Sequence, residues 1–267
     1  MTLFSSAKNI FIGLPKNPQD SRVFHQLSLI AFFAWVGLGA DGLSSSCYGP
    51  EAAFLALGEH RYLGIFVALL SAFTVFLISA SYSQIIRLFP AGGGGYLVAS
   101  KLLSPGVGMV SGCALLIDYV LTIAISIVSG SEALFSFLPL EWQPYKIFVA
   151  LFGIALLMLM NLRGVKESVM ILTPIFLLFV VTHLIVIVNA FITKWGYVPE
   201  FVHSSVNEIG VTHSEVGFWG LIFIILRAYS LGAGTFTGIE AVSNGLPILR
   251  EPKAATGQRT MVYMAIS

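Results

Sequence analysis

Long apolar runs, separated by short stretches that hold most of the charges, dominate the pattern of the chain. A helix needs about 20 mostly apolar residues to cross a bilayer. The runs predict membrane-spanning helices at 27–57, 62–88, 105–137, 145–161, 169–192 and 217–247. A further apolar run, Thr260–Ser267, amounts to about 12 Å of helix and is too short to cross. We therefore expect this sequence to be the front part of a longer protein.

The composition agrees with an all-α polytopic membrane protein of about six to seven transmembrane helices. Of the residues, 57% are hydrophobic and 10% are charged, and the mean hydropathy is +0.89. An ordinary soluble domain carries about 25% charged residues. The net charge of +1 provides no electrostatic footprint for nucleic acid. The two cysteines show no metal-ligand spacing, so we expect no metal centre and no cofactor.

Positive charges predict how the chain is oriented, because cytoplasmic loops of membrane proteins carry an excess of Lys and Arg. Ten of the 14 basic residues lie in alternate loops that begin with residues 1–26, and three lie in the opposite loops. We therefore expect residues 1–26 to be a cytoplasmic segment and residues 27–267 to form a transmembrane domain in the cell membrane. Residues 193–216 are then an extracellular loop.

Glycine clusters interrupt the first and sixth predicted spans near their middles. The first cluster surrounds Asp41 and consists of Gly37, Gly39 and Gly42. The second lies around Thr235 and Thr237 and consists of Gly232, Gly234 and Gly238. Each glycine costs about 1 kcal/mol in a helix interior, so we predict that both spans unwind there. Close helix packing is the alternative explanation of the glycines, but it does not account for the neighbouring carboxylates.

Three acids lie at membrane depth, where charged groups are costly and usually functional. They are Asp41, Asp118 and Glu240. Each belongs to a polar stripe at helical spacing. The stripes consist of Asp41, Ser44, Ser45 and Tyr48; of Asp118, Thr122, Ser126 and Ser129; and of Thr237, Glu240 and Asn244.

Paired Gly-interrupted spans in inverted repeats are typical of a transporter binding site. An amino-acid substrate would bring its own carboxylate, which Asp41 would repel. A monovalent cation would instead gain from carboxylate, hydroxyl and carbonyl oxygens together. We hypothesise that Asp41 and Asp118 help to bind the cation, and that Glu240 either binds it or takes a coupling proton.

Three motifs resemble the amino acid–polyamine–organocation (APC) transporter superfamily over nearly the whole chain. They are FPAGGGGYLVASKLLSPGVG after the second span, NLRGVK at Asn161–Lys166 and TFTGIEAVSN in the sixth span. The resemblance implies the LeuT-type fold of two inverted five-helix repeats, with helices 1 and 6 broken. This chain would hold the first repeat and the start of the second.

The first span departs from the usual amino-acid permease pattern, because GADGLSSSCYGPE places a carboxylate in its glycine-rich break. In this respect the chain is similar to KUP-type and related bacterial potassium importers. That resemblance implies proton-coupled potassium uptake. It also implies cation-binding roles for Asp41, Tyr48, Asp118, Tyr119, Thr122, Ser126, Thr237 and Glu240.

Alternatives to potassium transport remain open. The first is a proton-coupled amino acid permease, in which case a small amino acid replaces potassium as the partner. An intramembrane aspartyl protease is disfavoured, because the GxGD-like stretch at Gly37–Asp41 is one residue too long and Asp118 precedes Tyr119. We therefore expect no enzyme activity. A non-transporting fragment is the third alternative, and a homodimer is compatible with each of them.

Overall fold

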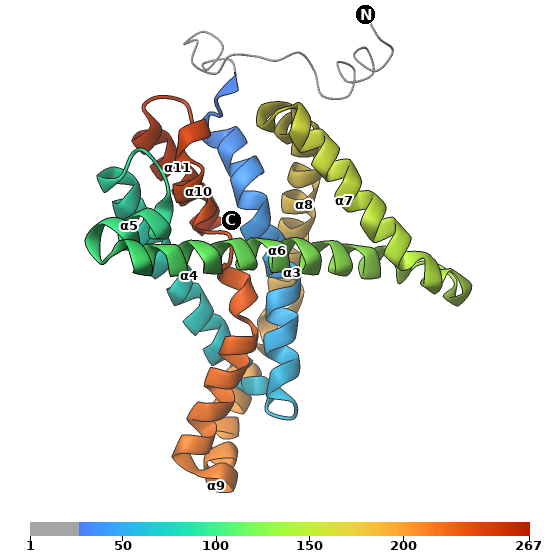
Figure 1. The fold of residues 1–267 in the computed structure, drawn as a ribbon. Helices are drawn as coiled ribbons and strands as arrows, with labels where there is room; N and C mark the ends of the chain where they lie inside the picture. Colours follow the sequence, from blue (N-terminus) through green and yellow to red (C-terminus); the bar gives the residue numbers. More distant parts are fainter. Residues whose placement is uncertain (1–26) are drawn as a thin grey trace, which may run out of the picture. The chain divides into compact units, whose positions relative to one another are not determined.

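The computed structural model describes residues 27–267, which form helices joined by short turns (Figure 1). The helices are α3 (Ala31–Leu57), α4 (Gly64–Leu88), α5 (Gly94–Leu102), α6 (Pro105–Phe135), α7 (Lys146–Arg163), α8 (Val165–Lys194), α9 (Val198–Leu231), α10 (Ala241–Asn244) and α11 (Lys253–Ile266). Short 3-10 segments are η1 (Arg61–Leu63), η2 (Leu140–Tyr145), η3 (Trp195–Tyr197), η4 (Ala233–Phe236) and η5 (Leu246–Ile248). The all-α prediction is confirmed. The predicted cytoplasmic segment, residues 1–26, lies outside the described residues.

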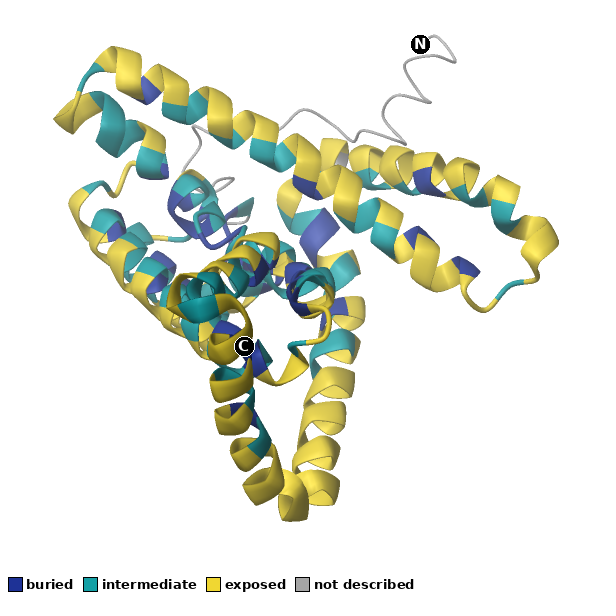
Figure 2. Ribbon diagram, turned by 90° about the horizontal axis from the view of Figure 1, so that it is seen from below, coloured by how far each residue is buried: buried dark blue, intermediate teal, exposed yellow. Residues whose placement is uncertain are grey.

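Four helical segments among the described residues are long and apolar enough to cross a membrane. They are Arg61–Leu88, Pro105–Phe135, Leu140–Leu162 and Val165–Leu231. Between 6% and 17% of the most apolar window of each is buried inside the protein, and exposed residues dominate these helices (Figure 2). So much exposed apolar surface needs lipid around it. The chain is therefore a multi-pass membrane protein.

The chain divides into two compact units. Unit 1 comprises the described residues up to Leu38, together with Ser83–Pro174 and Glu240–Thr260. Unit 2 comprises Gly39–Tyr82, Ile175–Ile239 and Met261–Ser267.

In unit 1, α6 packs against both α5 and α7. The segment that precedes α3 is tied to the segment that follows η5 by backbone hydrogen bonds. Leu29 N donates to Ile248 O at 2.9 Å, and Arg250 N donates to Leu29 O at 2.8 Å. Leu29 and Leu249 are 1% and 0% exposed, so this connection is part of the core of unit 1.

In unit 2, the core lies where the second half of α3, the start of α4 and the end of α9 meet. Its buried members are Ala53, Leu57, Leu63, Val67, Leu221 and Ala228. They come from sequence positions far apart, so burial of these side chains holds the end of α9 against the hairpin of α3 and α4. This packing fixes the position of the end of α9, and therefore the point from which the broken segment after α9 starts.

The predicted break in the first span is wrong, because α3 is a continuous α-helix from Ala31 to Leu57. Ser44 and Ser45 both donate hydrogen bonds from their hydroxyls to the carbonyl oxygen of Asp41, at 2.9 Å each. A Cβ built at Gly37 would lie 2.5 Å from Val169 Cγ2 of α8. The close-packing explanation therefore holds for Gly37.

The predicted break in the sixth span is confirmed. The α-helical backbone of α9 ends at Leu231, and η4 follows it. Thr237 is extended, with φ −69° and ψ 155°. Gly238 has a φ of 84°, a conformation that favours glycine. Regular helix resumes only with α10 at Ala241.

Most of residues 193–216, which were predicted to lie outside the membrane, form the first part of α9, and the side of the membrane on which they lie stays a prediction. Ser205, Ile209 and Thr212 are spaced so that they share one face of the helix, and this face packs against the protein. Sequence reasoning missed this spacing. Ser205 and Thr212 are 4% and 0% exposed. Gly217, with φ 73° and ψ 175°, interrupts α9 where the sixth span was expected to begin.

Candidate functional site

The carboxylate of Asp41 lies against the broken segment that follows α9, within unit 2. A Cβ built at Gly238 would be 2.7 Å from Asp41 Oδ2 and 2.8 Å from its Cγ. No side chain other than the hydrogen of glycine fits in this space. The positive φ of Gly238 and the absence of its Cβ together allow the backbone to pass directly beside the carboxylate.

Three hydroxyl groups gather next to Asp41. Ser45 Oγ lies 2.8 Å from Tyr48 OH and 3.1 Å from Thr237 Oγ1. Ser45 is fully buried. The predicted site residues Asp41, Tyr48 and Thr237 are therefore brought together in unit 2, and Ser45 of the first polar stripe joins them.

Two of these hydroxyls also contact backbone carbonyls. Ser45 donates to Asp41 O at 2.9 Å, and Thr237 donates to Gly234 O at 2.9 Å. A hydroxyl has a single proton but two lone pairs. Ser45 Oγ and Thr237 Oγ1 are also within hydrogen-bond distance of each other at 3.1 Å, and either atom can be the donor, so the three hydroxyls have more hydrogen-bond contacts than protons. Such a cluster is rich in acceptors and suits a positively charged ligand.

Two further glycines allow the break to approach α3 closely. A Cβ built at Gly49 would collide with Thr235, including its backbone nitrogen at 2.6 Å, and one built at Gly234 would lie 3.0 Å from Tyr48 Cε2. Thr235 itself donates its hydroxyl proton to Gly232 O at 2.8 Å. The glycines of α3 and of the break thus position the hydroxyl cluster by contact.

The other five predicted residues lie in unit 1, and four of them follow one face of α6. Asp118, Tyr119 and Ser126 are half-buried and Thr122 is 8% exposed. Their neighbours on the helix, Leu116, Ile117 and Val120, are exposed by 61% to 67%. The polar stripe predicted for this helix is therefore the face that α6 turns toward the protein.

Tyr119 connects α6 to the segment around α10. Asn244 Nδ2 donates to Tyr119 OH at 2.8 Å, and the backbone N–H of Asn244 donates to Glu240 O at 3.0 Å. Thr237 and Glu240 precede α10, so the third predicted stripe does not lie on one continuous helix. Glu240 instead stands at the N-terminal end of α10, as its N-cap residue.

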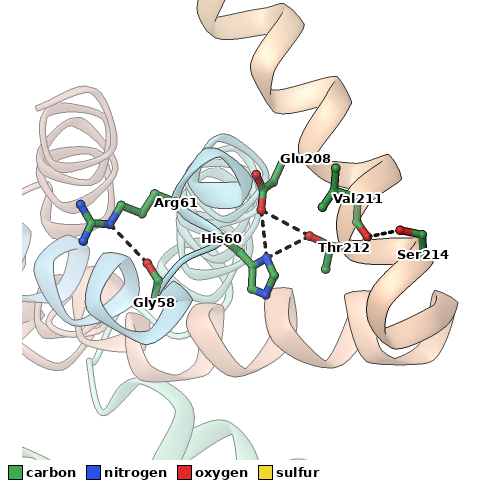
Figure 3. A network of polar contacts seen from close by, with 7 residues as sticks. All are labelled: Gly58, His60, Arg61, Glu208, Val211, Thr212 and Ser214. Carbon is green, nitrogen blue, oxygen red and sulfur yellow. Dashed lines mark hydrogen bonds and ion pairs between the residues drawn. The ribbon is translucent and has the colours of Figure 1, made fainter.

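A second polar cluster, which sequence reasoning missed, ties the loop after α3 to α9 in unit 2 (Figure 3). His60 Nδ1 lies 2.9 Å from Glu208 Oε1 and 3.0 Å from Thr212 Oγ1. Thr212 also donates to Glu208 Oε1 at 3.4 Å. Glu208 and Thr212 are four residues apart on one helical face, which is the signal that could have indicated the cluster.

Replacing His60 with alanine is expected to destabilise the protein by about 1–3 kcal/mol, because the buried Thr212 hydroxyl and the Glu208 carboxylate lose a hydrogen-bond partner. The measurement is the thermal unfolding midpoint of the purified protein. His203→Ala, on an exposed position of α9, is the control. In a double-mutant cycle with Glu208→Gln, a coupling energy near zero would contradict the interaction.

Comparisons with known proteins give one family match and two kinds of transporter among the relatives. Residues 27–267 match the family of amino acid permeases. The chain is 31% identical to the potassium transporter KimA of Bacillus subtilis, over 99% of this chain and 43% of that protein. It is 27% identical to the low-affinity putrescine importer PlaP of Escherichia coli, over 64% of this chain and 36% of that protein. The chain thus spans less than half the length of these relatives.

Proposed function

Because this chain belongs to the amino acid permease family, we propose that it provides the binding site of a secondary transporter that takes potassium into the cell. The site would be formed by α3 and by the broken segment after α9, with Asp41 as its fixed negative charge. The cation-binding roles of Asp118, Tyr119, Thr122, Ser126 and Glu240, which belong to unit 1, stay predictions from the sequence.

The observation that carries this proposal is the acceptor-rich cluster beside Asp41. Ser45 Oγ lies within hydrogen-bond distance of Tyr48 OH and Thr237 Oγ1, and Ser45 and Thr237 also contact backbone carbonyl oxygens. A dehydrated potassium ion is stabilised by several oxygens at once, and by a nearby carboxylate. A substrate that carries its own carboxylate would be repelled by Asp41. The similarity to a potassium transporter supports the same ion.

A coupling proton is the second part of the proposal. Carboxylates within membrane segments are the usual proton carriers of pumps and transporters. Glu240 belongs to the segment that joins the break to α10, and its Oε1 atom is buried. We assign to it either cation binding or the transfer of the proton. The distribution of Lys and Arg supports an N-terminus in the cytoplasm.

An organic amine is a second candidate substrate. The similarity to a putrescine importer favours it, and an ammonium group can be held by the same carboxylate and hydroxyl oxygens. An amino acid is less favoured, because its carboxylate would have to lie close to Asp41. A carboxylate on the substrate, which would be repelled by Asp41, therefore distinguishes an amino acid from an organic amine or a potassium ion.

Uptake measurements test the proposal. Cells that lack their own potassium importers and express the complete gene are given labelled rubidium, putrescine or amino acids. We expect rubidium to accumulate, and to compete with unlabelled potassium but not with putrescine. Uptake of putrescine or of an amino acid without uptake of rubidium would overturn the potassium assignment. A protonophore that leaves rubidium uptake unchanged would overturn the coupling proton.

A further inference from the structure

An apolar cavity of about 570 Å³ lies within unit 2, beside the hairpin of α3 and α4. Side chains of the second half of α3 and the first half of α4 form most of its wall, including Phe54, Leu57, Ile65 and Ala72. Phe201 of α9 contributes from the side. This volume falls in the range of sites that hold a small organic ligand, and the wall is mostly carbon surface, with Arg61, Ser71 and Thr235 as its polar members.

Arg61 is the one charged residue in the wall of this cavity. Its Nε donates to Gly58 O at 3.3 Å, and its guanidinium carbon lies 5.8 Å from the centre of the Phe54 ring. Among the described residues, no carboxylate lies within 4.0 Å of this guanidinium. Its outer N–H groups therefore keep the capacity to bind an anion in the bidentate manner of arginine.

The loop that carries Arg61 is held in place by its neighbour. His60 binds Glu208 and Thr212 of α9, whereas Arg61 points away from this cluster toward Gly58 (Figure 3). The adjacent Tyr62 is 43% exposed, as is common for tyrosines at the edge of a membrane. Arg61 also begins the apolar segment Arg61–Leu88. The guanidinium group of Arg61 thus lies at the boundary between the apolar cavity and the membrane surface.

We propose that this cavity binds an anionic phospholipid, with the lipid phosphate on Arg61 and an acyl chain against α3 and α4. A phosphate oxygen pair matches the planar guanidinium fork. The apolar wall matches the acyl chain, which a soluble anion lacks. The proposal does not depend on which substrate is transported.

Native mass spectrometry of the purified protein, with phosphatidylglycerol or phosphatidylcholine added, tests this site. We expect phosphatidylglycerol to be retained about fivefold more strongly than phosphatidylcholine, because one Arg near the surface contributes about that factor for an anionic lipid. Arg61→Gln should remove this preference, and Arg61→Lys should keep most of it. Inorganic phosphate in excess should not displace the lipid, because it lacks the acyl chain.

Two further variants separate the cavity from a general effect of charge or of folding. Arg87→Gln removes a cation from the other end of α4 and should leave the preference unchanged. Ala72→Phe, which fills the apolar wall, should reduce retention of both lipids, whereas Phe73→Leu on the exposed side of α4 should not. Equal loss in Arg61→Gln and Arg87→Gln would overturn the proposal. So would unchanged lipid retention in Ala72→Phe, or displacement by inorganic phosphate.

Discussion

Replacing Asp41 with asparagine is expected to reduce rubidium uptake by the complete protein at least about tenfold, because an interaction with a charged group contributes about 1.5–3 kcal/mol. Asparagine keeps the shape of the side chain beside Gly238, where the space is limiting, and removes only its charge. The measurement is the initial rate of labelled rubidium uptake at equal amounts of protein in the membrane.

The control for this experiment is Glu51→Gln, which removes the charge of an exposed acid on the same helix, α3. It should leave uptake nearly unchanged. If Asp41→Asn retains full uptake, Asp41 does not bind the cation and the proposed site is lost. If both variants lose uptake equally, the effect belongs to the charge of α3 as a whole rather than to the cluster around Ser45.

Replacing Gly49 with alanine is expected to destabilise the protein more than any other glycine-to-alanine substitution in unit 2. The new Cβ would meet Thr235 at its backbone nitrogen, 2.6 Å away, and at its Cα, 3.0 Å away. Backbone atoms cannot rotate aside as a side chain can. Overpacking of this kind costs about 1–3 kcal/mol, and we expect the thermal unfolding midpoint to fall by about 5 °C or more.

The matched control is Gly210→Ala in α9, where a Cβ would meet nothing within 4 Å. Alanine there should leave the unfolding midpoint unchanged or raise it slightly, because glycine costs about 1 kcal/mol in a helix interior. If Gly49→Ala is as stable as Gly210→Ala, then α3 and the break do not approach as closely as the structure indicates. A stable Gly49→Ala variant with reduced rubidium uptake would instead place the effect in the site.

Several features of the fold and the site follow from local sequence patterns. The polar stripe of α6 was predictable because side chains three and four residues apart share a helical face. The break after Leu231 was predictable because glycines cluster there, and Gly238 adopts a positive φ. The same reasoning failed for α3, where the glycine pattern is similar but the helix continues.

The difference between the two glycine clusters lies in their neighbours. In α3, glycine provides room for Val169 and Thr235, residues more than a hundred positions away in the chain. Their packing energy stabilises a helix that the local propensity disfavours. The helical first part of α9 was missed for a related reason, since its buried side is polar and forms the cluster of His60, Glu208 and Thr212.

The sequence by itself determined that this chain consists of membrane-spanning helices and that the sixth span is interrupted. These properties depend on the number and spacing of apolar residues along a short stretch of chain. Only the tertiary structure decided that α3 is continuous and that Asp41 lies against Gly238, with the Ser45 and Thr237 hydroxyls 3.1 Å apart. Such contacts depend on segments that are distant in sequence, and their packing energy outweighs local preference.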